Sequence, residues 1–277
     1  MRLGYNSNGL QNHRLDDALR LLADHGYQAV ALTADVCHLD PFRSSAGEVA
    51  AIAALLAKLR LLPVIESGAR FLLDPRHKHE PTLMTRDRAA RDRRLDFMAR
   101  LSQLGQDLGA RVVSFWTGTD HQPGADSVAW LDDGVRAACA VIRQAGLEPA
   151  LEPEPGMAIA TTAAFGALRQ RLGAEAPAMT LDIGHLYAEW EGEVVPIVSA
   201  WAPFAVQIHL EDMRRGRHEH LPPGDGEVDF DAVLTALSVA GYAGPVCFEL
   251  SRGSHRAPEL VQRCRQLWQR ILPGLQR

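Results

Sequence analysis

The sequence predicts a single-domain (β/α)8 barrel of the TIM type that spans residues 1–277, and two observations lead to this prediction. Amphipathic helical segments that stop at a glycine alternate along the chain with short apolar runs. The apolar runs are continuous rather than alternating in polarity, which is typical of parallel strands that helices cover on both faces. Eight such strand–helix units fit one barrel, although the length alone would also allow two domains.

The eight expected units follow one another without a linker or a low-complexity segment between them. A first strand at 3–5 precedes helical positions that recur at Leu15, Ala18, Leu19 and Leu22 and stop at Gly26. Glycine suits the position after a helix because it adopts the left-handed conformation without a Cβ clash. Later helices stop in the same way at Gly109, Gly146, Gly173 and Gly241. The remaining expected strands lie at 29–32, 62–65, 111–115, 147–151, 178–181, 205–209 and 246–250.

Two connections are longer than a barrel needs, 67–87 after the third strand and 211–229 after the seventh. Both should emerge at the C-terminal face, where barrel active sites are built. The competing fold, a doubly wound sheet, requires a glycine-rich phosphate turn after its first strand. The segment Asn6-Ser7-Asn8-Gly9 is not such a turn, so the barrel is favoured.

Composition narrows the range of partners and compartments. A formal charge of −5 and a pI near 6.1 argue against nucleic acid, whose phosphates are neutralised by Lys and Arg. We expect no membrane partner, because no apolar run reaches the ~18 residues of a membrane span, and the first residues lack a secretory pattern. The four cysteines are scattered, as is typical of unpaired thiols in a reducing compartment: Cys37, Cys139, Cys247 and Cys264. We therefore expect a cytoplasmic protein.

Polar side chains mark the C-terminal ends of four successive expected strands. They are Glu152, Asp182, His209 and Glu249. Three carboxylates and an imidazole at one barrel mouth would repel one another and lose hydration energy unless a cation lies among them. Such an oxygen-rich set suits octahedral Mn²⁺, Mg²⁺ or Co²⁺ and can also hold Zn²⁺. The sequence therefore predicts a metal site.

Short motifs at these strand ends carry a family resemblance. They are Leu151-Glu152-Pro153, Asp182-Ile183-Gly184-His185, His209-x-x-Asp212, the turn Gly224-Asp225-Gly226-Glu227-Val228-Asp229-Phe230, and Phe248-Glu249. Because of the order of these motifs and their positions at strand ends, the chain resembles the xylose isomerase-like TIM barrel superfamily of sugar isomerases and epimerases, which includes endonuclease IV. The resemblance implies that Glu152, Asp182, His209 and Glu249 bind the metal. It also implies that Glu152 and Glu249 are catalytic and that His185 contacts the substrate.

The expected reaction is isomerisation or epimerisation of a sugar, a sugar phosphate or a related polyol. It requires removal of a proton from a carbon beside a carbonyl. That C–H group is too weak an acid to lose its proton without catalysis. A divalent ion chelated by two neighbouring sugar oxygens stabilises the enediolate, and a carboxylate on either side takes and returns the proton. We therefore expect a small carbohydrate-like substrate and a divalent cofactor, and the oligomeric state stays open.

An alternative function rests on the loop after the seventh strand. His218 and His220 resemble the residues with which endonuclease IV-like proteins hold an additional zinc together with the histidine after strand six, here His185. Three imidazoles would make a tetrahedral zinc site with one open position. The alternative is thus a metal-dependent hydrolase or phosphoesterase of the endonuclease IV type with a second metal at His185, His218 and His220. The other interpretations of His218 and His220 are exposed loop residues or a direct substrate contact.

Departures from the family patterns favour the epimerase. The third and fourth strands end in 65–68 and 115–118, which lack the further zinc-binding histidines of the nuclease-like pattern. Glu154 stands where xylose isomerases carry a lysine that assists hydride shift, which favours proton transfer.

Several other side chains are candidates for substrate binding. Arg70 and Lys78, in the basic loop 67–87, can clamp a phosphate or carboxylate, because Arg forms bidentate pairs with both, or can lie on a solvated face. The other candidates are His38, Trp116, Arg215 and Arg217.

Overall fold

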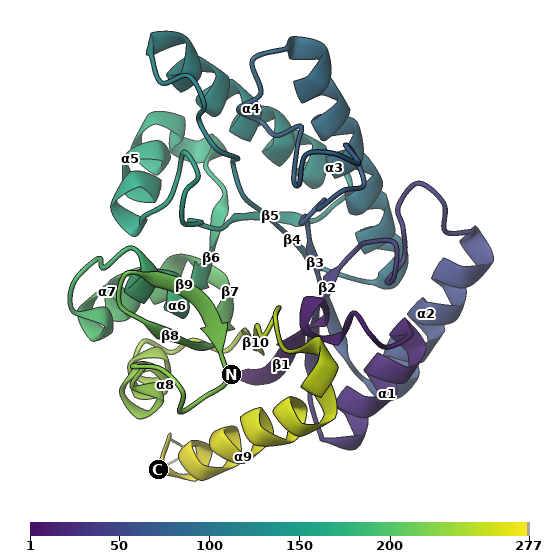
Figure 1. Ribbon diagram of the computed structural model, residues 1–277, viewed down its shortest axis with the longest axis vertical. Helices are drawn as coiled ribbons and strands as arrows, with labels where there is room; N and C mark the ends of the chain where they lie inside the picture. The colour runs from purple at the N-terminus through teal and green to yellow at the C-terminus, as the bar shows by residue number, and fades with distance from the viewer. Residues whose placement is uncertain (276–277) are drawn as a thin grey trace.

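The computed structural model describes residues 1–275 and contains a closed barrel of eight parallel strands. Around the barrel the strands follow in chain order, and β1 closes it by pairing with β10 (Figure 1). They are β1 (Arg2–Asn6), β2 (Ala29–Thr33), β3 (Leu62–Glu66), β4 (Val112–Phe115), β5 (Glu148–Leu151), β6 (Ala178–Asp182), β7 (Ala205–Leu210) and β10 (Pro245–Phe248). The predicted fold is confirmed, and each expected strand is present.

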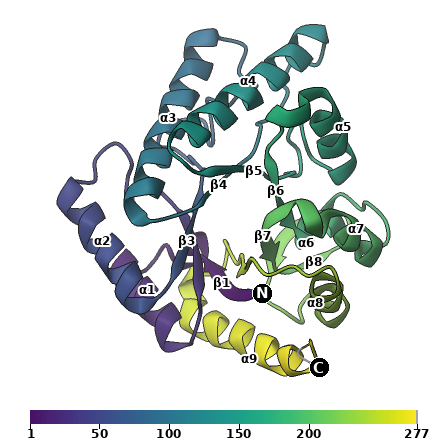
Figure 2. The same cartoon turned by 180° about the vertical axis from the view of Figure 1, so that it is seen from behind.

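Helices form the outer layer on all sides of the barrel, as Figures 1 and 2 show from its two ends. They are α1 (Leu15–Asp24), α2 (Ala46–Leu59), α3 (Arg88–Leu108), α4 (Ala125–Gln144), α5 (Thr162–Leu172), α6 (Ile183–Ala188), α7 (Val194–Trp201), α8 (Phe230–Val239) and α9 (Ala257–Leu275). Short 3-10 helices lie at η1 (Ser7–Leu10), η2 (Gly173–Glu175), η3 (Ala202–Phe204) and η4 (Ser254–Arg256). The core lies mainly between the two layers, where Phe97 and Phe165 are fully buried.

The connection 211–229 is more regular than a loop. It contains an antiparallel hairpin of β8 (Asp212–Arg214) and β9 (Arg217–Leu221), which turns at Gly216 in the left-handed conformation. Asp212 fixes the hairpin, because its carboxylate accepts the backbone N–H groups of Gly224 at 2.7 Å and Val228 at 3.0 Å. A single buried aspartate thereby holds β9, which carries His218 and His220, at the barrel mouth.

Between residues 1 and 275, no helix has the length and apolar character needed to cross a membrane. All four cysteines are free thiols, of which Cys37 is half-buried and the other three are buried.

Gly184 is required by close packing beneath the barrel mouth, so we expect Gly184→Ala to destabilise the fold by about 1–3 kcal/mol. A Cβ at this position would overlap with Oε1 of Glu211, a fully buried side chain. Overpacking of this kind forces neighbouring groups to move. Chemical denaturation of the purified variant measures the change.

The matched control is Gly47→Ala, at an exposed position in α2 where a Cβ would meet nothing closer than 4.0 Å. We expect this variant to keep its stability or to gain up to about 0.5–1 kcal/mol, because alanine has less backbone freedom than glycine in the unfolded chain. Equal stability of the two variants would contradict the packing argument.

Candidate metal centre

The four predicted ligands meet at the C-terminal mouth of the barrel. One ligand atom from each of Glu152, Asp182, His209 and Glu249 lies within 4.8 Å of the others. His209 is at the centre, with its Nδ1 atom 2.9 Å from Glu152 Oε1, 2.8 Å from Glu249 Oε2 and 3.8 Å from Asp182 Oδ2. The grouping follows from the fold, because strands β5, β6, β7 and β10 are neighbours and all end at this mouth.

The two glutamates have different proton affinities, although both are buried. Burial raises the pKa of Glu152 to about 7, although the nearby His209 opposes the rise. Burial also acts to raise the pKa of Glu249, but the charge and hydrogen bond of His209 outweigh it and hold this pKa well below its usual range. The Asn8 amide, which donates to Glu249 Oε1 at 2.7 Å, acts in the same direction.

The donor set fits a divalent cation. Within the described residues, the buried Oδ2 atom of Asp182 has no hydrogen-bond partner. A buried carboxylate oxygen without a donor is costly unless a cation or a proton compensates it. Three carboxylates and one imidazole provide the oxygen-rich set that octahedral divalent ions accept.

Glu66 and Gln207 orient His209, and neither was predicted from the sequence. Glu66 Oε1 lies 3.2 Å from His209 Nε2 and accepts from the Gln207 amide at 2.6 Å. With Nε2 facing Glu66, Nδ1 is directed at the three carboxylates, which is the usual arrangement of a metal-binding histidine backed by a carboxylate. Glu66 could have been predicted from the sequence, because it is also the last residue of a barrel strand.

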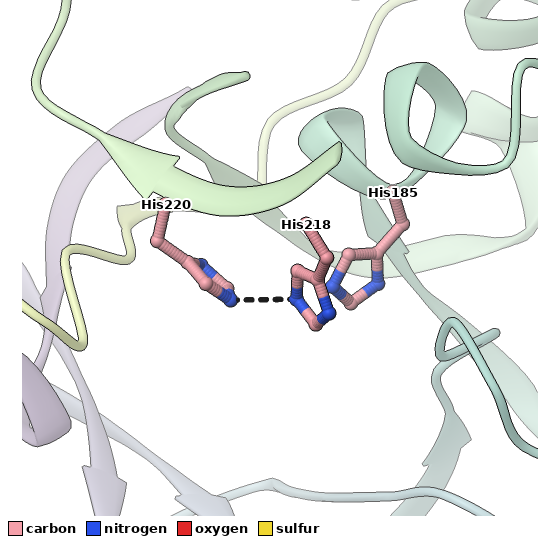
Figure 3. Close-up of side chains that lie close together, drawn as sticks. All are labelled: His185, His218 and His220. Atoms are coloured by element: carbon pink, nitrogen blue, oxygen red, sulfur yellow. Dashed lines mark hydrogen bonds between the residues drawn. The ribbon is translucent and has the colours of Figure 1, made fainter. Parts of the chain in front are cut away.

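A second group of side chains consists of His185 from α6 and of His218 and His220 from β9 (Figure 3). The Nε2 atoms of His218 and His220 are 2.7 Å apart, and the His185 and His218 ring centroids are 4.9 Å apart. Burial lowers the pKa of His218 to about 3 and also lowers that of His220. Both rings are therefore neutral near pH 7, the form that binds metals.

His185 connects the two groups. Its Nδ1 atom is 3.0 Å from the Pro153 carbonyl, whereas its buried Nε2 atom has no hydrogen-bond partner in the described part of the chain. That Nε2 atom lies 3.4 Å from Asp182 Oδ2 and 3.8 Å from Glu154 Oε2. The four-ligand cluster and the histidine group thus form one continuous polar centre.

A cavity of about 470 Å³ opens onto this centre. Of the predicted substrate-binding residues, Arg70, Lys78 and Trp116 line it. Arg252, from the segment after β10, also lines it and was not predicted. The cavity is within the size range of small-molecule sites.

Four predicted substrate contacts, His38, His185, Arg215 and Arg217, are not among the residues that line this cavity. His38 is buried, and its Nε2 atom lies 3.1 Å from the His13 carbonyl. The Arg215 guanidinium lies 4.0 Å from the centroid of the Trp190 ring, and Arg217 is exposed on β9. These side chains instead take local partners or face solvent, which strand order could not reveal.

A family model described as "Xylose isomerase-like TIM barrel" matches residues 19–270. L-ribulose-5-phosphate 3-epimerase UlaE of Shigella flexneri serotype 5b (strain 8401) is 26% identical over 261 residues, which cover 90% of this chain and 87% of that protein.

Two solved structures have a similar fold. A structure described as L-ribulose 3-epimerase has a TM-score of 0.79 at 20% identity and covers 99% of this chain and 95% of its own. The IOLI protein, described with a bound zinc atom, has a TM-score of 0.79 at 18% identity and covers 99% of each chain.

Proposed function

The chain belongs to the xylose isomerase-like TIM barrel family, and from this premise we propose that it is a divalent-metal-dependent sugar epimerase. The observation that carries the proposal is the cluster of Glu152, Asp182, His209 and Glu249 at the base of a polar cavity. Its substrate class is a ketose, in which the inverted carbon lies beside the carbonyl. The epimerase relative supports this class, and the hydrolase alternative gains no support from the proteins named above.

In this proposal, Glu152 and Glu249 exchange protons on two sides of a substrate. Glu152 follows β5 and Glu249 follows β10, and strands β6 and β7 lie between those two in the barrel. When bound, a divalent cation would polarise the substrate carbonyl and make the neighbouring C–H acidic. One carboxylate then removes the proton from one face, and the protonated partner delivers a proton to the other face.

The different proton affinities of the two glutamates describe the centre before a cation binds. Glu249, whose pKa is held low, is the more readily ionised of the two. Glu152, whose pKa is raised to about 7, holds its proton more tightly and would release it on binding a cation. The direction of the reaction decides which carboxylate removes the substrate proton and which returns it.

The test is exchange of a carbon-bound proton with solvent. The Mn²⁺-loaded protein is incubated in D₂O with a panel of ketopentoses and ketohexoses, with and without a terminal phosphate. NMR is expected to show deuterium at the carbon beside the carbonyl and formation of the epimer. A metal-loaded protein that exchanges no sugar in the panel would contradict the proposal.

We also propose that His185, His218 and His220 hold a second cation, for which zinc suits a set of three imidazoles. The support is the approach of two neutral rings to 2.7 Å and the buried His185 Nε2 atom without a hydrogen-bond partner among residues 1–275. This second site shares no ligand with the four-ligand cluster, although His185 Nε2 lies 3.4 Å from Asp182 Oδ2.

We expect the double variant His218→Ala/His220→Ala to lose one metal equivalent per chain and to keep the other. Elemental analysis after removal of loosely bound ions measures the stoichiometry. His77→Ala is the control, because His77 is an exposed histidine whose ring contacts Asp74 at 3.0 Å. If the wild-type protein binds only one metal equivalent, the proposal of a second site is contradicted, whereas the proposal of the four-ligand site stands.

A further inference from the structure

The loop 67–87 places a lysine, Lys78, beside the candidate metal centre. The chain contains 29 basic residues, of which only Lys58 and Lys78 are lysines. Lys58 is on α2, in the outer layer, whereas Lys78 lines the cavity together with Arg70. Lys78 forms no hydrogen bond or ion pair with any described residue, so its three donors are free to bind a ligand.

The backbone around these two cations is fixed. Arg70 and His79 both adopt the left-handed conformation, with φ of 44° and 71°, which non-glycine residues keep only where surrounding structure enforces it. The His79 N–H donates to the Arg70 carbonyl at 2.6 Å and closes this part of the loop. Lys78 therefore precedes an anchored residue on the cavity wall.

A buried arginine supports the same wall from behind. Arg94 of α3 donates to the Ser67 carbonyl at 2.9 Å, at the start of the loop. Its guanidinium lies 4.4 Å from the centroid of the Trp116 ring, and Trp116 in turn packs edge to face on His79 at 5.0 Å. The loop thus presents its cations from a packed support.

Arg70 retains donor capacity for a ligand. Its Nε atom lies 3.5 Å from Asp35, and Nη1 donates to Gln11. These contacts orient the guanidinium, and Nη2 has no partner among the described residues. A cation in the metal centre would offset the carboxylates of this cavity, which leaves Arg70 and Lys78 to attract an anion.

We propose that Arg70 and Lys78 form a subsite for a terminal oxyanion of the substrate, a phosphate or a carboxylate. This inference rests on the proposed function and restricts the substrate class to anionic ketoses. Arg supplies a fixed fork of donors and Lys a mobile point charge, a combination suited to a group with several oxygens. The competing cation in the cavity is Arg252, but its Nη2 atom already donates to the His218 carbonyl at 2.7 Å.

The experiment compares kcat/KM of the Mn²⁺-loaded protein for one ketopentose, its 5-phosphate and the corresponding sugar acid. We expect the 5-phosphate or the acid to exceed the neutral sugar by about 100-fold, since a hydrogen bond to a charged group contributes ~1.5–3 kcal/mol. Lys78→Met should reduce that preference by about 10- to 100-fold, mainly through KM. Lys58→Met, the matched control, should leave it unchanged.

A binding measurement separates this inference from the proposed reaction. Inorganic phosphate should protect Lys78, and not Lys58, from reductive methylation, as read by peptide mass spectrometry. Protection without turnover of any sugar supports the subsite and counts against the epimerase. Equal kcat/KM for the neutral and anionic sugars overturns the subsite and leaves the epimerase standing. Loss of the preference in Arg252→Met but not in Lys78→Met also overturns it.

Discussion

Replacing Glu249 by glutamine is expected to lower kcat for epimerisation by about 10³-fold or more. General acid–base catalysis contributes about 10²–10⁴-fold, and this residue is also a candidate metal ligand. Glutamine preserves the shape of the side chain and its contact with Asn8, so the fold should persist. Steady-state kinetics at saturating Mn²⁺, with the metal content measured for each sample, tests the expectation.

Replacement of Glu152 and replacement of Glu249 should impair proton exchange in different ways. Each single variant retains one carboxylate, so it should still exchange deuterium into one epimer while conversion to the other epimer is lost. Glu152→Gln and Glu249→Gln should therefore exchange opposite epimers. Glu219→Gln is the control, because Glu219 lies on the same hairpin as the histidines but pairs with Arg214 at 3.1 Å. Wild-type turnover by Glu249→Gln at full metal occupancy would contradict the assigned role.

The four-ligand cluster could be predicted from sequence because barrel topology converts strand order into spatial proximity. Strands that are consecutive in the chain become neighbours, and their C-terminal residues meet at one mouth. The prediction needed only the apolar runs that end at Glu152, Asp182, His209 and Glu249. The same rule would have identified Glu66, had strand three been treated like the others.

Loop side chains could not be placed by this rule. Arg215 packs on Trp190, from the segment between α6 and α7, and Arg252 reaches the carbonyl of His218 on β9. Neither contact has a periodic or local signature, because each depends on how two separate connections fold together. The hairpin of β8 and β9 was missed for the same reason, since Asp212 fixes it through backbone groups that lie 12 and 16 residues further along the chain.

Removal of bound metal is expected to abolish epimerisation and to destabilise the protein. A ligand present at 1,000 times its Kd stabilises the folded state by ~4 kcal/mol, and chelation removes that contribution. Without a cation, the carboxylates of Glu152, Asp182 and Glu249 lie within one buried cluster. Thermal unfolding before and after dialysis against a chelator measures the change, and added Mn²⁺ or Co²⁺ should restore both activity and stability. An unchanged melting temperature together with full activity would contradict the metal site.

The metal-free protein should lose stability as the pH rises from about 4.5 to 9. Burial raises the pKa of Glu152 to about 7 and that of Glu154 to about 8, so the stability that each contributes as a neutral acid is present below pH 4.5 and is lost as the pH rises through the folded-state pKa. Although burial opposes it, the neighbouring carboxylates raise the pKa of His185 to about 9, so the stability from its charge is present below pH 6.5 and lost through pH 9. Metal binding requires the deprotonated ligands and strengthens over the same interval. The difference in melting temperature between the metal-loaded and metal-free proteins should therefore widen with pH, and a difference that narrows would contradict this account of the buried centre.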